Sequence, residues 1–341
     1  MKKGKQVTAS DVAQLAGVSI STVSRVISNN PKISEPTRLK VLECMDKLEY
    51  YPNANARSLA IKKTGTIGIV IPTTSEDYFS NPFFTESLRG IIKGASNLDY
   101  DLLVSTNTEK GEELKIIQKF IRGSKVDGII LMTSKINDEC IEYLENIDFP
   151  FSLIGSTIEQ DKRTNQVDND NYSAAYELTK HILDNGRRNV AMIVGDMDLI
   201  VSKERVKGYK KALEDYNIGF DSKLLFSGSF DEKTGYYYGK KISKINPIPD
   251  GLIVTDDLVA FGAVKALHDM GVNIPKDIQV GSFNNSSLAE HSNIPLTSVE
   301  INASQLGKEA MKLLVDAIEN ETRGKKILVP YTIYKRKSTR R

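Results

Sequence analysis

The sequence of 341 residues contains no tryptophan, two cysteines and three histidines. Cys44 and Cys140 show neither a metal-ligand spacing nor a disulfide pattern, which favours a reducing, cytoplasmic setting. Histidines, cysteines and paired carboxylates form no catalytic set, and there is no phosphate-binding loop. No apolar run approaches the roughly 20 residues that span a bilayer, and no secretory signal is visible. We therefore expect no enzyme, no cofactor or metal site, and no membrane attachment.

Charge is distributed unevenly along the chain. Residues 1–63 hold 11 Lys and Arg against 5 Asp and Glu, whereas the remainder holds 35 against 39. A basic end on an acidic body favours a polyanionic partner for that end, although a solvated charged surface would show the same pattern. The length predicts two or three domains.

The first 50 residues predict three short helices. Thr8 and Asp11 have the spacing of a capping box, Gly17 follows the first helix, Ser19 can cap the second, and Ser34 begins the third. A tight turn joins the first two helices, as in a helix-turn-helix whose second helix can enter the major groove. The expected apolar stripes are Val12, Leu15 and Ala16; Val23, Val26 and Ile27; and Val41, Leu42, Met45 and Leu48.

The second of these helices carries side chains that can read bases. Arg25 can bind guanine through two hydrogen bonds, Ile20 can contact a thymine methyl, and Ser21 can donate or accept. Packing in the core is an alternative role for Ile20, and Arg25 can equally be a solvated surface charge.

The run "DVAQLAGVSISTVSRV", within residues 7–60, resembles the DNA-binding headpiece of the lactose-repressor family. The resemblance implies a headpiece over residues 1–52. It also implies that Ile20, Ser21 and Arg25 face bases, and that phosphates are held by Thr8, Ser19, Thr22 and Asn29.

The segment "NANARSLA" begins at Asn53 and is too short to form a stable helix alone in water. The resemblance implies a hinge helix over residues 53–63, with Asn53 among the DNA contacts. This helix would fold on the operator, pair with its mate in a dimer, and insert Leu59 into the minor groove as a wedge. Alternatively, Leu59 packs against the next domain.

From residue 64 onward, short apolar runs alternate with amphipathic helical stretches, which is typical of an α/β fold with buried parallel strands. The number of runs favours two sheets. The resemblance implies a periplasmic-binding-protein-like core, residues 64–341, with a first lobe of 64–165 and 296–327 and a second of 166–295 and 328–341. The expected strands are 66–72, 100–106, 126–132, 149–155, 189–195, 223–228, 250–255 and 278–283, and the expected helices include 83–98, 202–215, 256–270 and 299–318.

Polar residues follow most of these strands, and ligands of open α/β sheets bind beyond the carboxyl ends of strands. Hydroxyl, amide and carboxylate groups at these ends suit a neutral polyol, and Phe83 and Phe84 can stack on a sugar ring. Taken singly, each polar end can instead cap the helix that follows.

The family resemblance implies specific ligand contacts. The motif "SKERVKGYKKAL" implies that Arg205 reaches the ligand, "VTDDLVAFGAVKAL" places Asp256 in the pocket, and "VDNDNYSAAYELTKHILDNGRRNVAMI" places Asp168 near the cleft. Asn284 and Asn285 stand where many members carry two aspartates. Asn284 can still hydrogen-bond a ligand, but the neutral pair disfavours a cationic one.

These features together favour a homodimeric, sugar-controlled transcription repressor that binds a pseudo-palindromic operator. The segments "TTSEDYFSNPFFTESLRGI" and "FDEKTGY" look most like maltose-operon repressors of Gram-positive bacteria, which implies maltose or a malto-oligosaccharide as effector. One alternative is a catabolite-control regulator that binds a phosphorylated carrier protein near 299–312, which Gln305 disfavours because such regulators carry an acid there. A sugar-binding transport receptor and a carbohydrate enzyme are further alternatives. The sequence identifies neither the operator nor the sign of regulation.

Overall fold

The computed structural model describes residues 7–28, 30–50, 63–74, 80–107, 112–157 and 163–340. The chain divides into two compact units. The first comprises Met1–Thr66 and Ser124–Asp127, and the second comprises Ile67–Gly123 and Gly128–Arg341. None of the helices in the described ranges is long and apolar enough to cross a membrane.

The first unit contains three mutually packed helices, α1 (Ala9–Ala16), α2 (Ile20–Ile27) and α3 (Glu35–Lys47). The prediction that Leu15 and Leu42 belong to the apolar stripes is wrong, because they are 51% and 45% exposed. Two small residues of α1, Ala13 and Ala16, face the other helices instead of Leu15 and allow a close approach. The buried core is Val12, Ala13, Ala16, Val23, Val26, Val41 and Cys44.

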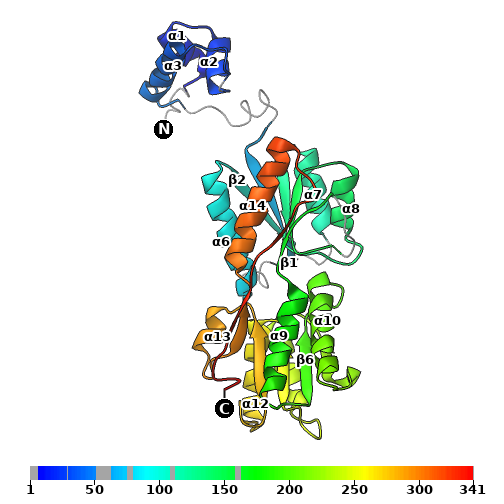
Figure 1. Cartoon of the computed structure of the whole chain (residues 1–341). Helices are drawn as coiled ribbons and strands as arrows, with labels where there is room; N and C mark the ends of the chain where they lie inside the picture. The colour runs from blue at the N-terminus through cyan, green and yellow to red at the C-terminus, as the bar shows by residue number, and fades with distance from the viewer. Residues whose placement is uncertain are drawn as a thin grey trace. The chain divides into compact units, whose positions relative to one another are not determined.

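The second unit is built from two six-stranded sheets, which we call the sheets of the first and second lobes (Figure 1). The strand orders are β11-β5-β4-β3-β1-β2 and β12-β10-β9-β8-β6-β7. Pairing is predominantly parallel, and β12 runs antiparallel to β10. The first sheet contains β1 (Thr66–Thr74), β2 (Asp101–Asn107), β3 (Gly128–Leu131), β4 (Phe151–Ile154), β5 (Asn165–Asp168) and β11 (Lys326–Leu328). The second contains β6 (Val190–Val194), β7 (Leu225–Ser227), β8 (Gly251–Val254), β9 (Gln279–Phe283), β10 (Thr297–Glu300) and β12 (Thr332–Tyr334).

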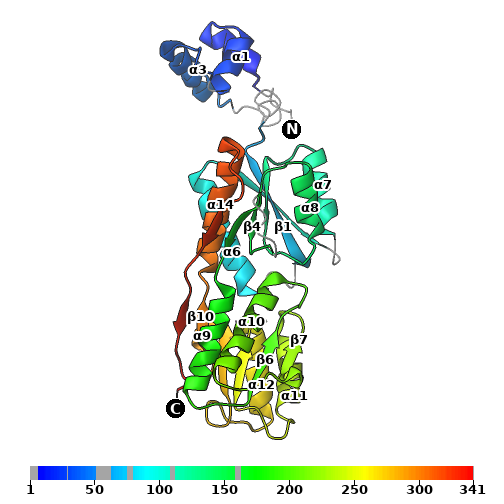
Figure 2. The same cartoon turned by 45° about the vertical axis from the view of Figure 1, so that its right-hand side comes forward.

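Helices cover both faces of each sheet. In the first lobe, α6 and α14 lie side by side on one face, and α7 and α8 lie on the other (Figures 1 and 2). In the second lobe, α9 packs against α10 and α11 packs against α12. The bounds are α6 (Pro82–Asn97), α7 (Glu113–Arg122), α8 (Glu139–Asn146), α9 (Asn171–Asp184), α10 (Ile200–Asp215), α11 (Glu232–Ile242), α12 (Asp257–Asp269), α13 (Ser287–His291) and α14 (Ala303–Asn320).

Glycines set the close approach of α6 and α14. A Cβ atom at Gly90 would collide with the backbone oxygen of Ser304, and one at Gly307 would collide with the backbone oxygen of Ser87. Neither helix can therefore carry a side chain at its crossing point, and the two backbones touch. This contact confirms that the helix expected at 299–318 packs back on the first lobe.

The eight predicted strands are present, but β5, β10, β11 and β12 were missed. These four are short and lack a long apolar run; β5 reads NQVD and β10 reads TSVE. They also correct the expected lobe boundaries, because β5 extends the first lobe to Asp168 and β10 puts residues 297–300 in the second lobe.

Candidate functional site

The turn between α1 and α2 is fixed by local chemistry. Gly17 adopts a left-handed backbone conformation with φ of 65° and ends α1. The Ser19 hydroxyl then accepts a hydrogen bond from the Thr22 N–H at 3.2 Å and also lies 2.8 Å from the Ser21 hydroxyl. Thr8 closes the capping box with Asp11, as the sequence predicts. These contacts orient α2 with its N-terminal turn accessible.

The accessible face of α2 carries the side chains that were expected to read bases. Ile20 is 54% exposed, which argues against the alternative of core packing, and Ser21 and Arg25 are exposed as well. Arg25 has no acidic ion-pair partner among the described residues. The expected DNA contacts Asn29, Asn53 and Leu59, with nearly all of the hinge, lie outside the described residues.

In the second unit, the Asp256 carboxylate caps α12 and also contacts the residue that caps α6. Its Oδ1 accepts from the N–H groups of Leu258 and Val259 and so caps α12. Its Oδ2 accepts from Nδ2 of Asn284 at 2.8 Å and from Nδ2 of Asn81 at 3.1 Å. Asn81 caps α6 of the first lobe, so this carboxylate links the two lobes.

The electrostatic environment of Asp256 is unfavourable for a charge. Its side chain is 2% exposed, and burial together with the adjacent carboxylate of Asp257 raises its pKa to about 7. The four N–H donors described above partly oppose this shift by stabilising the ionised form. A donor from a ligand could substitute for one of them without changing the local charge.

Arg205 is buried beside Thr255, the residue that precedes Asp256. Its Nε donates to Oδ1 of Asn171 at 3.0 Å, and its Nη1 donates to the carbonyl oxygen of Thr255 at 2.6 Å. The guanidinium lies over the ring of Phe283, 4.1 Å from the centroid. Burial lowers its pKa to about 10, and the nearby carboxylate of Asp168 opposes that shift, so the group stays charged at neutral pH. Nη2 has no hydrogen-bond partner among the described residues.

Asp168 and Asn171 connect Arg205 to the end of β5. Oδ1 of Asp168 accepts from Nδ2 of Asn171 at 2.9 Å and from the N–H of Asn169 at 2.8 Å. Burial raises the pKa of Asp168. We call the set Asn81, Asp168, Asn171, Arg205, Asp256 and Asn284 the polar cluster.

The two phenylalanines are placed differently from the polar residues. Their rings meet edge to face, with centroids 5.2 Å apart. Phe84 packs against the core of the first lobe, whereas Phe83 contacts the cores of both lobes. Phe83 therefore contributes to the contact between the lobes. Both phenylalanines are half-buried, and stacking of either ring on a sugar stays a prediction.

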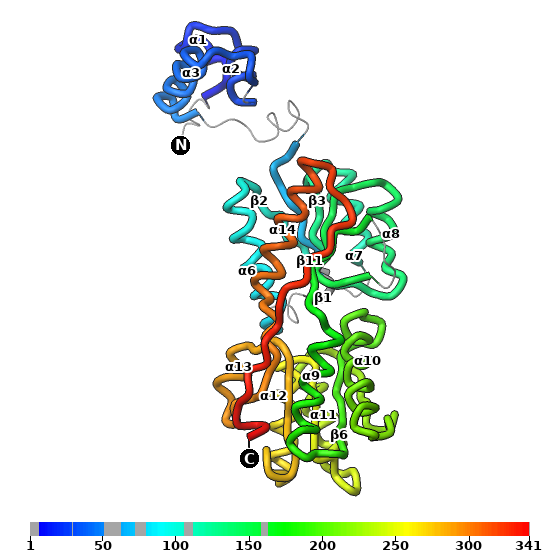
Figure 3. Tube along the Cα trace, viewed as in Figure 1, coloured from blue at the N-terminus to red at the C-terminus, as the bar shows by residue number. Residues whose placement is uncertain are grey.

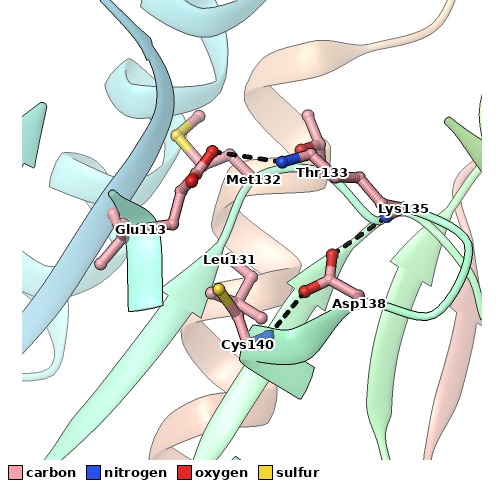
Figure 4. Close-up of a pocket in the computed structure, with 8 residues that line it drawn as sticks. Glu113, Leu131, Met132, Thr133, Lys135, Asp138 and Cys140 are labelled. Carbon is pink, nitrogen blue, oxygen red and sulfur yellow. Dashed lines mark hydrogen bonds and ion pairs between the residues drawn. The ribbon is translucent and has the colours of Figure 1, made fainter. Parts of the chain in front are cut away.

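A cavity of about 850 Å³ adjoins the polar cluster. Of the polar cluster, Asp168 and Asn171 line it, whereas Asn81, Arg205, Asp256 and Asn284 are not among its lining residues. Its other polar and charged lining is Ser156, Thr157, Thr164, Gln166, Asn169, Asp170, Tyr172, Lys203, Glu204, Lys207 and Lys326. A second cavity, of about 30 Å³, lies beside the ion pair of Glu113 with Lys135 (Figure 4) and has room for little more than one water molecule. The large cavity is thus the better candidate for a small-molecule ligand.

Sequence reasoning did not single out three asparagines, namely Asn81, Asn169 and Asn171. A signal existed for Asn81, because it precedes Pro82 at the start of a predicted helix and could be recognised as a helix cap. Asn169 and Asn171 lie in the run "VDNDN", where only Asp168 was chosen. Asn169 contacts two distant backbone carbonyls and Asn171 contacts the distant Arg205 side chain, and the sequence reveals neither relation.

Comparison with known proteins agrees with both units. Residues 8–53 match the model of the bacterial regulatory proteins of the lacI family, and residues 179–339 match a periplasmic binding protein-like domain. The transcriptional regulator MalR of Streptococcus pneumoniae serotype 4 is 34% identical over 322 residues, which is 94% of this chain and 95% of that protein.

Two further relatives extend over nearly the whole chain. Catabolite control protein A of Priestia megaterium is 34% identical over 337 residues, covering 98% of this chain and 99% of that protein. The solved complex of the regulator CelR with cellobiose is 28% identical, with a TM-score of 0.77 over 97% of this chain and 99% of that one. The expected resemblance is confirmed, and the chain belongs to the lacI family of bacterial regulatory proteins.

Proposed function

We propose that the protein is a sugar-responsive, DNA-binding transcriptional repressor of an operon for maltose or malto-oligosaccharide use. The proposal is carried by one combination: an exposed helix-turn-helix face and a core with a buried polar cluster beside a sugar-sized cavity occur in one chain. The similarity to MalR supports maltose as the sugar, and the cellobiose complex of CelR supports a disaccharide. A repressor acts where its operator is, so a cytoplasmic location follows.

On the DNA side, residues 1–52 would form the headpiece and residues 53–63 the hinge. Ile20, Ser21 and Arg25 would contact bases in the major groove. Thr8, Ser19, Thr22 and Asn29 would hold phosphates, and Asn53 and Leu59 would act from the hinge. A symmetric homodimer would place two headpieces on the two half-sites of a pseudo-palindromic operator.

On the effector side, the sugar would bind to the polar cluster and occupy the adjoining cavity. A volume of about 850 Å³ lies in the range of roughly 300–1,000 Å³ that is common for ligand pockets. Nη2 of Arg205 is available to a sugar hydroxyl, as are the further lone pairs of Asp168. No bond of the sugar needs to break, and we expect maltose to be recovered unchanged.

The contact of Asn81 with Asp256 suggests how a sugar could change the lobes. A sugar hydroxyl that donates to Oδ2 of Asp256 would compete with the Asn81 amide, which belongs to the other lobe. Occupancy would then loosen one link between the lobes, and the change would reach the hinges. By linkage, the sugar must bind the released state more tightly than the DNA-bound state, with a coupling of about 1–3 kcal/mol.

The test is operator affinity with and without maltose, for the wild type and for Arg205→Lys. Lysine keeps the positive charge but loses the planar fork of donors, so we expect maltose affinity to fall about tenfold or more while operator binding without sugar is retained. Lys211→Ala, on the exposed side of α10, is the matched control and should behave as the wild type. If maltose leaves the wild-type affinity unchanged, the maltose assignment fails. A fully responsive Arg205→Lys would place the pocket elsewhere.

A second candidate is a catabolite-control regulator, because catabolite control protein A is as similar as MalR in overall identity. Its carrier-protein surface would lie around the start of α14, where Gln305 is exposed and donates to Glu309 at 2.7 Å. A phosphorylated carrier protein that raises operator affinity would favour this candidate.

A further inference from the structure

Three described segments cross between the two lobes, and one side chain touches all of them. The crossovers are residues 169–170 between β5 and α9, 301–302 between β10 and α14, and 329–331 between β11 and β12. In Figure 3 the last of them can be followed from β11 toward the C-terminus. Asn169 belongs to the first crossover and is 5% exposed.

Both N–H groups of the Asn169 side-chain amide have hydrogen-bond partners. Nδ2 donates to the carbonyl oxygen of Val329 at 2.8 Å and to that of Ile301 at 3.0 Å, so each of its two N–H groups has a crossover carbonyl as partner. The backbone supports the same arrangement, because the N–H of Val329 donates to the carbonyl oxygen of Asp168 at 2.8 Å. An aspartate has no donors and a serine has one, so asparagine is the smallest side chain that can hold both carbonyls.

Asn169 is also connected to the polar cluster. The backbone carbonyl oxygen of Asn169 accepts from the backbone N–H of Asn171 at 3.0 Å and from Nδ2 of Asn171 at 3.4 Å. Oδ1 of Asn171 accepts from Nε of Arg205 at 3.0 Å. Two residues therefore separate the guanidinium from the carbonyls of Ile301 and Val329. Any displacement of Arg205 toward a ligand acts on Asn171, and through it on the backbone of Asn169.

We propose that Asn169 is a positioning residue that transmits ligand occupancy at Arg205 to all three crossovers and so to the relation between the lobes. This inference rests on the proposed sugar response. Rotation of one lobe changes the spacing of the Ile301 and Val329 carbonyls, and the Asn169 amide links that spacing to the polar cluster. Without the amide, a bound sugar still contacts Arg205, but Ile301 loses its hydrogen bond to Asn169, and Val329 keeps only the backbone hydrogen bond to Asp168.

The experiment measures the response ratio, which is the operator dissociation constant with maltose divided by that without. Because Asn169 also lines the large cavity, the ratio is measured at saturating maltose, so that a change in maltose affinity does not enter it. We expect Asn169→Ala to lower this ratio about tenfold, or to about one if the wild-type ratio is smaller. Typical couplings correspond to ratios of about 5–150. Asn169→Ser keeps one donor and should give an intermediate ratio.

Asn302→Ala is the matched control. Nδ2 of Asn302 also donates to a crossover carbonyl, that of Pro330, at 2.8 Å, but its side chain is exposed and has no hydrogen bond to the polar cluster among the described contacts. We expect its ratio to stay within about twofold of the wild type. A wild-type ratio in either folded Asn169 variant would overturn the proposal. So would an equal loss in Asn302→Ala, which would indicate that any weakened crossover suffices.

Hydrogen exchange separates this inference from the proposed function. If wild-type protein does not respond to maltose, the proposed function fails, and exchange rates without sugar then decide the role of Asn169. Transmission predicts that Asn169→Ala speeds exchange about tenfold both at the hydrogen-bonded amide of Val329 and in the turn of α10 that carries Arg205, with β8 unchanged. Faster exchange confined to the crossovers would overturn the proposal.

Discussion

Replacing Arg205 with alanine should destabilise the second unit as well as weaken sugar binding. The substitution removes two hydrogen bonds from a charged donor, each worth about 1.5–3 kcal/mol, and a contact with the Phe283 ring worth up to about 2 kcal/mol. The cost of burying the guanidinium offsets part of this gain. The variant also removes a positive charge that interacts with the buried carboxylates of Asp168, Asp256 and Asp257. Removing one partner of a buried charge set typically costs about 3–5 kcal/mol, and we expect a loss in that range.

Urea denaturation followed by far-ultraviolet circular dichroism measures this loss, with Lys211→Ala on the same helix as the control. The Lys211 side chain is exposed and pairs with Glu214 at 3.1 Å and Asp215 at 2.9 Å, and exposed ion pairs contribute little, so its removal should leave the free energy of unfolding nearly unchanged. Equal stability of the two variants would refute the reasoning, because it would show that the buried contacts of Arg205 contribute no more than an exposed ion pair.

Four further predictions concern DNA, the hinge, pH and assembly. Arg25→Ala should cost roughly 1–3 kcal/mol on operator DNA and little on random DNA, and an equal loss on both would reduce Arg25 to a phosphate contact. Leu59→Gly should weaken specific binding and leave sugar binding intact, and unchanged DNA bending in the variant would argue against a wedge. Folding raises the pKa of Asp256 from 3.8 to about 7, so ionisation of this carboxyl opposes folding. Its contribution to the free energy of unfolding should therefore fall as pH rises from about 4 through 7. Asp256→Asn should flatten that part of the stability profile against pH, and an unchanged profile would show that Asp256 does not titrate there. Light scattering should report a dimer at working concentration, and a monomer or tetramer would contradict the symmetric arrangement on the operator.

Local signals predicted more of this protein than distant ones did. Thr8, Gly17 and Ser19 act on neighbours within a few residues, so their roles as caps were predictable and are confirmed. Long apolar runs likewise predicted the central strands. By contrast, the partners of Arg205 are 34 and 50 residues away, and no spacing rule indicates Asn171 or the carbonyl of Thr255. The short strands were missed for a related reason, since they are defined by the neighbours that they pair with.

The hydrogen bond between Asn81 and Asp256 is a further contact between distant residues that the sequence did not predict. Each residue caps its own helix, which the sequence can indicate, but their mutual contact spans 175 positions. The alternative that polar strand ends act as helix caps is therefore correct for Asp256, and the same carboxylate also joins the lobes.

The three crossovers also bear on synthesis of the chain. Because α14 and β11 belong to the first lobe but follow nearly all of the second lobe in sequence, the first lobe lacks a helix and an edge strand until residue 328 has been made. The second lobe in turn awaits β12 and the buried Ser338, whose hydroxyl donates to the carbonyl oxygen of Val280 at 2.6 Å. Neither lobe is therefore complete until almost the whole chain has been made. The headpiece has no such dependence, because its three helices come from residues 9–47, and it can fold on the ribosome long before a core exists to regulate it.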